Sequence, residues 1–287
     1  MANYNLDRIR NALNKQQAAP AGGKQQFVKN KYFKPGIGKY DLRFMPFLSD
    51  EGEPTQEVLY YEKLTADGKR IVAPQGFGLP DPIRDLFDEK RKEKNGWGVA
   101  KFLKAKKRYY AIVIDRKDEA AGPQLWEFSE EIRDALYNVL VSKDYEDEYV
   151  LDKDKGYDWE LNVTQALDGA GKPRTFNNNV VKKYILTIRK RPSPLHKDQT
   201  IAAKWLEDMP KLSEMFKRMC KTPEELIDIL ENFVARLETE GEPKREEGTD
   251  HNAARVSSST ATATVEASEE DSDDVIESKL DGAFGGL

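Results

Sequence analysis

Cationic and aromatic side chains are concentrated in residues 101–117. Five of the eight residues from Lys101 to Arg108 are Lys or Arg, Phe102 lies among them, and two tyrosines follow. Such cations can neutralise phosphates, and flat rings beside them can stack on unpaired bases of any identity. The stretch therefore suits a single-stranded nucleic acid as ligand. A buried strand with a solvated basic entry would show the same residues, and the stretch alone leaves both interpretations open.

Further segments combine basic and aromatic residues. Residues 24–43 hold six Lys or Arg against one acid, and residues 182–197 hold six basic residues and no acid. A loop expected over 168–179 contains Lys172, Arg174 and Phe176. Because side chains alternate across a strand, about half of the candidate rings should point outward. In the pair Tyr60 and Tyr61, one ring should face the core and the other the ligand.

Patterns for catalysis and metal binding are weak. Cys220 and the two histidines are too far apart in sequence to form a zinc motif. Residues 166–173 lack the first glycine and the Ser or Thr of a phosphate-binding loop. Asp115, Asp118 and Glu119 could imitate the carboxylate cluster of a nuclease, but a strand-end turn with solvated charges explains them more simply. The residues favour a non-enzymatic binding protein with no cofactor.

Short strands separated by turns should position these side chains. Alternation and turn signals predict strands over residues 40–47, 56–62, 69–73, 109–114, 124–128, 157–164 and 180–189. Capping signals and apolar spacing predict helices over residues 82–94, 130–141, 201–220 and 224–237. This order differs from repeated βαβ units. It predicts a mainly β, α+β fold in the form of a partly open barrel with added helices.

The charge distribution divides the chain. Residues 238–287 hold 14 acidic and 4 basic residues, whereas residues 1–237 hold 42 basic and 37 acidic residues. A mildly basic body with an acidic tail indicates either that the body binds nucleic acid or that the tail has a regulatory role. We expect an N-terminal arm and linker over residues 1–23, a folded core over 24–240, and a disordered acidic tail over 241–287. A single cysteine and the lack of an apolar leader favour the cytosol.

Three motifs, in this order, resemble the single-stranded-DNA-binding (helix-destabilising) protein family of the T-even and related tailed phages. They are LRFMP at residues 42–46, KKRYYAIVID at 106–115 and GPQLWEFSEEIRDAL at 122–136. A weaker likeness continues through LNVTQ at 161–165, LSEM at 212–215 and the acidic tail. The resemblance therefore covers nearly the whole chain.

The resemblance implies an OB-fold barrel whose cationic, aromatic-lined cleft binds single strands without sequence preference. By position it assigns DNA contacts to Arg43, Lys104, Lys106, Lys107, Arg108, Tyr110, Trp126 and Phe176. The residue patterns add Tyr60, Lys101, Lys172 and Arg174. Some family members carry a zinc-binding subdomain where this chain has residues 74–94. Those residues contain no His or Cys, so no zinc is expected.

The resemblance also assigns roles to the two ends of the chain. The basic arm should mediate cooperative self-association through Arg8, Arg10 and Lys15. The acidic tail should bind replication proteins, such as a polymerase, a helicase loader or a recombination mediator, through Asp273, Asp274, Ile276, Leu280 and Phe284. Because of its charge, the tail should also compete with DNA for the basic surface.

The sequence thus predicts a protein that coats single-stranded DNA during phage DNA replication, recombination and repair in the cytoplasm of an infected bacterium. Three alternatives stay open. An RNA-binding translational repressor would use the same cations and rings. A metal-dependent nuclease would use Asp115, Asp118 and Glu119, and a partner adaptor would act through its acidic tail.

Overall fold

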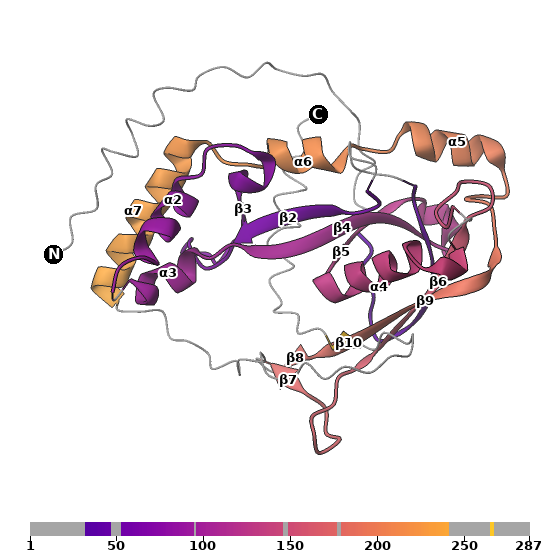
Figure 1. The fold of residues 1–287 in the computed structure, drawn as a ribbon, viewed down its shortest axis with the longest axis horizontal. Helices are drawn as coiled ribbons and strands as arrows, with labels where there is room; N and C mark the ends of the chain where they lie inside the picture. The colour runs from indigo at the N-terminus through magenta and orange to yellow at the C-terminus, as the bar shows by residue number, and fades with distance from the viewer. Residues whose placement is uncertain are drawn as a thin grey trace.

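The computed structural model describes residues 32–46, 53–94, 96–145, 149–176 and 179–240, together with the pair 265–266. These residues form a mostly antiparallel sheet with helices packed on it (Figure 1). The α+β class predicted from the sequence is therefore confirmed. Outside the described residues lie the predicted arm contacts Arg8, Arg10 and Lys15 and the predicted tail contacts Asp273, Asp274, Ile276, Leu280 and Phe284.

The strands form one open sheet and a separate hairpin. In chain order they are β1 (Gly38–Phe44), β2 (Gln56–Tyr61), β3 (Ile71–Val72), β4 (Lys106–Asp115), β5 (Gln124–Phe128), β6 (Tyr157–Gln165), β7 (Thr175–Phe176), β8 (Asn179–Val180), β9 (Lys182–Pro192) and β10 (Val265–Glu266). They pair in the order β10-β9-β6-β1-β4-β2-β3, with β5 also pairing β4, while β7 pairs only β8. Since β10 and β3 do not pair with each other, the described strands do not close into a barrel.

Strand β4 connects the parts of the sheet. Its first half pairs with β2, from Lys106 opposite Tyr60 to Tyr110 opposite Gln56. Its last three residues pair with β1, and residues 109–113 pair with β5 along the other edge. Residues 109–114 are all buried, so both faces of β4 are covered.

Helices α4 (Glu130–Leu140) and α6 (Leu212–Arg218) cover the two faces of the central strands. The other described helices are α2 (Pro82–Lys90), α3 (Trp97–Leu103), α5 (Gln199–Glu207) and α7 (Pro223–Glu240), with short 3-10 turns η1 (Pro74–Phe77), η2 (Glu119–Ala121) and η3 (Lys143–Tyr145). Figure 1 shows α4 on one side of β4 and α6 on the other. No helix among the described residues is long and apolar enough to span a lipid bilayer.

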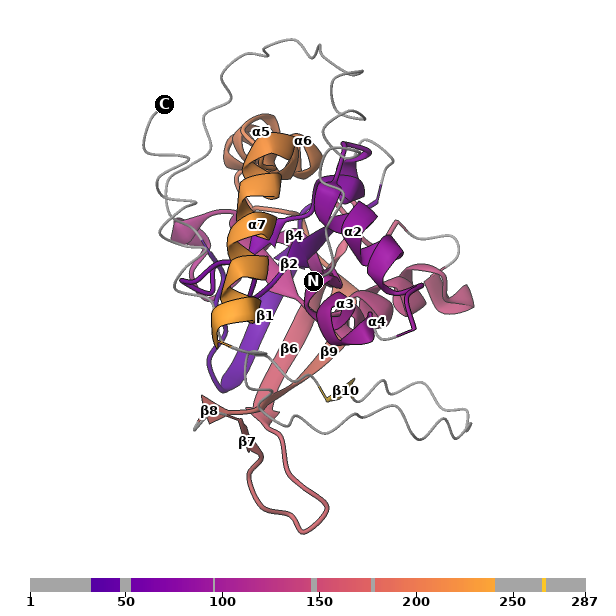
Figure 2. The ribbon, with the colours of Figure 1, turned by 90° about the vertical axis from the view of Figure 1, so that its left-hand side faces the viewer.

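The buried side chains form two clusters. The larger cluster is built on the sheet together with α4 and α6. The smaller one includes Tyr61, Ile71 and Leu103 and is packed among α2, α3 and α7. These three helices, which we call the helical lobe, lie together at one end of β2 and β4 (Figures 1 and 2).

Local hydrogen bonds explain where several helices begin. Asp81 Oδ1 accepts two backbone N–H groups from the first turn of α2, at 3.1 and 3.2 Å. Thr222 and Glu225 form a capping box at the start of α7, with Glu225 N donating to Thr222 Oγ1 at 3.3 Å and Thr222 N donating to Glu225 Oε2 at 2.9 Å. Ser129 is the residue before α4, and its side chain makes no capping hydrogen bond.

Candidate nucleic-acid interface

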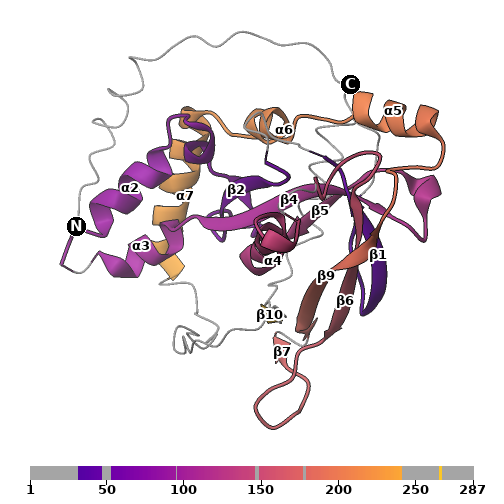
Figure 3. The same ribbon diagram turned by 45° about the vertical axis from the view of Figure 1, so that its right-hand side comes forward.

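A row of lysines lies where the helical lobe joins the sheet. Lys101 lies in the last turn of α3, Lys104 follows the helix, and Lys106 and Lys107 open β4. Figure 3 shows α3 leading into β4 at this boundary. Three of these side chains are exposed and Lys101 is half-buried. The structure therefore brings together four of the predicted contacts, which we call the junction lysines (Lys101, Lys104, Lys106 and Lys107).

Each cation of β4 has a carboxylate partner from a neighbouring segment. The pairs are Lys106–Glu62, Lys107–Glu57 and Arg108–Glu127, with N–O distances of 2.6, 3.3 and 3.2 Å. The Lys107–Glu57 pair is exposed and contributes only about 0–1 kcal/mol, so a phosphate can compete for Lys107, whereas Glu62, the partner of Lys106, is 11% exposed. Lys104 differs from these cations, because it makes no ion pair with any described residue.

A buried polar network lies beneath the β4 cations. The side chain of Arg70 is 3% exposed, with Nη1 2.7 Å from Glu127 Oε1 and Nε 3.4 Å from Glu62 Oε1. The Tyr110 hydroxyl donates to Glu127 Oε2 at 2.6 Å and lies 2.8 Å from the hydroxyl of Tyr60. Burial by itself would lower the pKa of Arg70, but Glu127 and Glu62 raise that pKa above its ordinary value. The guanidinium therefore stays charged and holds both glutamates in place.

Contacts within this network shift the pKa values of Glu62 and Tyr110. Burial would raise the pKa of Glu62, but the hydrogen bond from Lys106 and the nearby guanidinium groups bring that pKa below its ordinary value. Burial and the charge of Glu127 raise the pKa of Tyr110 well above its usual range, so its hydroxyl stays protonated. Glu62 and Glu127 pair with Lys106 and Arg108 at the outer side of this network.

Four of the predicted DNA contacts are buried, which corrects the predicted interface. Arg43 is 0% exposed, and Tyr60, Tyr110 and Trp126 are each 2% exposed. The prediction that one ring of Tyr60 and Tyr61 would face the ligand is wrong, because each ring fills one of the two clusters. The physical reason is that α4 and α6 cover opposite faces of β4 and its neighbours. These side chains therefore have no surface on which a base could stack.

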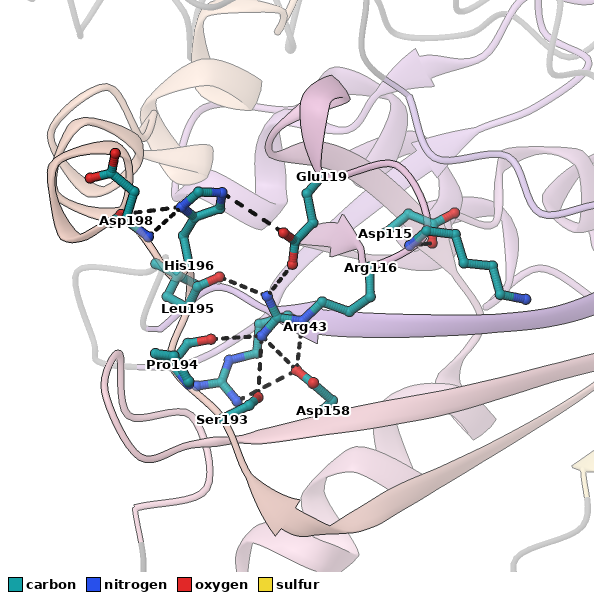
Figure 4. Close-up of polar contacts among 11 residues, drawn as sticks. Arg43, Asp115, Arg116, Glu119, Asp158, Ser193, Pro194, Leu195, His196 and Asp198 are labelled. Carbon is teal, nitrogen blue, oxygen red and sulfur yellow. Dashed lines mark hydrogen bonds and ion pairs between the residues drawn. The ribbon is translucent and has the colours of Figure 1, made fainter.

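Arg43 belongs to a polar cluster near the last residues of β4 (Figure 4). It donates to the carbonyl of Asp152, and its Nη1 lies 3.9 Å from Asp158 Oδ1, which Arg116 Nη2 also binds at 2.8 Å. Burial lowers the pKa of Arg43 to about 10, although Asp158 opposes this shift. A side chain at Gly156 would overlap the Arg43 guanidinium. The cluster ties the loop at residues 150–156 to the sheet.

The carboxylates considered for a nuclease do not converge. Asp115 Oδ1 accepts the backbone N–H of Lys117 at 2.9 Å, whereas Glu119 Oε1 accepts from Arg116 at 2.7 Å. Figure 4 shows the Asp115 and Glu119 side chains pointing in different directions. Within the described ranges, no three His, Cys, Asp or Glu side chains are grouped so as to hold a metal ion. The absence of catalysis and of zinc remains a prediction.

The predicted contacts Lys172, Arg174 and Phe176 lie on a different surface. They belong to the β7–β8 hairpin and the loop before it, at the far end of β6 and β9 (Figures 1 and 3). Lys172 is exposed, and the other two residues are half-buried. Both views separate this hairpin from α3 and the start of β4. The structure therefore does not join these residues to the junction lysines.

Trp97 is an exposed ring that the sequence patterns did not reveal. It is 60% exposed and is the first residue of α3, a short helix that was not predicted. The available signal was an indole between Gly96 and Gly98 in a strongly basic stretch. The carboxylates that pair with the β4 cations were also missed, because only the register of the strands brings them there.

Comparison with known proteins does not assign the chain to a family. It matches no protein-family model. No curated protein matches it either. The arrangement itself has exposed cations along one edge of the helical lobe and an exposed indole at the first residue of α3.

Proposed function

We propose that the protein binds single-stranded DNA without sequence preference and coats it during phage DNA replication, recombination and repair. The observation that carries this proposal is the row of junction lysines at the boundary between the helical lobe and the sheet. The lysines along the path of the strand would each neutralise a backbone phosphate and release its counterions. The resemblance of three ordered motifs supports DNA over other polyanions, and the open sheet is compatible with an OB-fold-derived barrel.

The proposed mechanism needs neither catalysis nor a cofactor. A protein that binds the single strand and not the duplex shifts the melting equilibrium by mass action. The basic arm would join neighbouring copies along the strand, and the acidic tail would recruit replication proteins. The setting would be the cytoplasm of an infected bacterium.

The spacing of the lysines indicates a path for the bound DNA strand. Lys101 lies in the last turn of α3, and Lys104 caps the C-terminal end of that helix three residues later. Lys106 and Lys107 point to opposite faces of β4, so a strand that follows Lys101 and Lys104 continues along only one of them. Lys104 is the cation common to both paths, and it makes no ion pair with a described carboxylate.

The test is binding of labelled oligo-dT, a matched duplex and an RNA of the same sequence across a salt series. We expect tight binding to oligo-dT that weakens steeply with salt, and much weaker binding to the duplex. Lys104→Gln should reduce the slope of log K against log salt by about 0.7, the value for one lost phosphate contact on a single strand. Lys211→Gln is the matched control, since Lys211 is also exposed but lies at the start of α6.

Other outcomes would contradict the proposal. Salt-insensitive binding, or equal affinity for the duplex, would show that the lysines are only a solvated face. Preference for RNA would favour a translational repressor, which would use the same cations. Magnesium-dependent cleavage that is lost in Asp115→Asn would favour the nuclease.

A further inference from the structure

The exposure of Trp97 has no explanation in the packing of the fold. It is 60% exposed, whereas Trp126 and Trp159 are 2% and 0% exposed and Trp205 packs against the larger cluster. Helix α3 is anchored through Ala100 and Leu103, which are buried, and the Trp97 ring is not part of either cluster. Single exposed apolar side chains are common on protein surfaces, so the significance of Trp97 depends on the side chains beside it.

The ring begins the helix that leads to the junction lysines. Residues four positions apart share one side of a helix, so Lys101 lies on the side of α3 that carries Trp97, and Lys104 is the residue that follows the helix. At a rise of 1.5 Å per residue, Lys101 is about 6 Å from Trp97 along the helix axis. The helix therefore presents a flat ring followed by cations, which continue into β4.

Contacts of Lys90, Glu93 and Gly96 lie just before the first residue of α3. Lys90 is buried, and its Nζ lies 2.7 Å from Glu93 Oε1. Gly96 N donates to the carbonyl of Glu93 at 3.2 Å. A side chain at Gly96 would overlap the carbonyl oxygen of Lys90, so this position requires glycine. Close packing of the turn thus places Trp97 at the end of the cation row.

We propose that Trp97 stacks on an unpaired base of the bound strand while the lysines behind it bind phosphates. This inference rests on the proposed function and adds a source of single-strand selectivity. Phosphates are present in both single and double strands, so the lysines alone discriminate weakly. The face of a base is free for stacking only when the base is unpaired and unstacked, and aromatic stacking tolerates every base.

The test compares Trp97→Ala and Trp97→Phe with the wild type in the full-length chain. Trp97→Ala should weaken oligo-dT binding by roughly 5- to 150-fold, the usual effect of losing one stacked ring. The salt slope should not change, because no cation is removed. Trp97→Phe should retain most of the affinity. Val141→Ala removes another exposed apolar side chain, at the end of α4, and should bind like the wild type.

Intrinsic fluorescence gives a second readout that does not depend on affinity. Stacking on a base quenches indole emission, and the buried Trp126 and Trp159 cannot report it. Quenching by oligo-dT should therefore disappear in Trp97→Phe and persist in Trp205→Phe. This pair of variants decides the question even if Trp97→Ala loses stability.

The outcomes separate the inference from the proposed function. If the wild type fails to bind oligo-dT, the proposed function is wrong. If the wild type binds but Trp97→Ala binds equally well, or if quenching persists in Trp97→Phe, the stacking role of Trp97 is wrong and the function stands. If Trp97→Ala leaves DNA binding unchanged but abolishes self-association, the ring is a protein contact, which also overturns the stacking role.

Discussion

Replacing Glu127 by alanine should destabilise the protein strongly, because this carboxylate neutralises a buried guanidinium. Glu127 is 2.7 Å from Arg70 Nη1, accepts from Tyr110 at 2.6 Å and lies 3.2 Å from Arg108 Nε. Without it, Arg70 keeps only Glu62, at 3.4 Å. Removing one partner of a buried ion pair costs about 3–5 kcal/mol. Because Glu127 is a quarter exposed, water can partly replace it, so we expect about 3 kcal/mol.

Equilibrium unfolding in urea measures this effect. In a domain of this size, a loss of about 3 kcal/mol corresponds to a drop in Tm of roughly 6–12 °C. Glu127→Gln keeps an acceptor oxygen, so it should lower the free energy of unfolding less than Glu127→Ala does. Glu130→Ala is the control, because Glu130 is an exposed carboxylate paired with Arg133 at 3.1 Å. Removing the Glu130 carboxylate should lower the free energy of unfolding by about 1 kcal/mol or less.

A double variant separates the charge from the packing. Arg70→Met combined with Glu127→Leu removes both charges and keeps apolar volume, so it should recover much of the stability lost in Glu127→Ala. If Glu127→Ala lowered the free energy of unfolding no more than Glu130→Ala does, the Arg70–Glu127 pair would behave like an exposed ion pair, and the reasoning from burial would be refuted. If the double variant were less stable than Glu127→Ala, the cost would come from packing and not from an uncompensated charge.

A chain truncated after Glu240 should bind oligo-dT more tightly than the intact chain at low salt, because the removed segment holds 12 acidic and 4 basic residues; the difference should fade at high salt. Burial raises the pKa of the Cys220 thiol to about 11, so a disulfide reagent at pH 8 should label the folded protein on the order of 100-fold more slowly than the urea-unfolded chain. Stability contributed by that protonated thiol should be lost as pH rises from about 8.5 towards 11. Gly96→Ala should cost about 1–3 kcal/mol in urea unfolding, because its methyl group overlaps the Lys90 carbonyl. Gly169→Ala, which meets nothing within 4 Å, should be nearly neutral.

Local signals in the sequence predicted most of the elements. The strand expected over residues 124–128 coincides with β5, and the capping box at Thr222 opens α7. The helix α3 was missed, because its seven residues follow Gly96 and include Gly98, and both glycines disfavour a helix on local propensity. Burial of Leu103 and Ala100 in the helical lobe overrides that propensity. The openness of the sheet depends on pairings between strands far apart in the chain, which no local pattern specifies.

The cations of the site were predictable and its rings were not. Charged side chains are rarely buried without a partner, so a basic run such as residues 101–108 is expected at the surface wherever it lies. A tyrosine or tryptophan in a strand is exposed only if that face of the sheet is uncovered. Tyr110 and Trp126 are buried because α4 and α6 pack on the two faces of the sheet, and this packing is decided by segments later in the chain.

The carboxylates beside β4 determine which lysine matters most for binding. A phosphate that approaches Lys106 or Lys107 meets Glu62 or Glu57 at the same cation, so part of its attraction is already used within the protein. Lys104 has no such partner among the described residues. Neutralising Lys104 should therefore weaken oligo-dT binding more than neutralising Lys107. Conversely, Glu57→Gln should strengthen binding, since it releases Lys107 without disturbing the buried network of Glu62 and Glu127. Equal losses of oligo-dT affinity on neutralising Lys104 and Lys107 would mean that the Lys107–Glu57 ion pair does not reduce the attraction of Lys107 for phosphate.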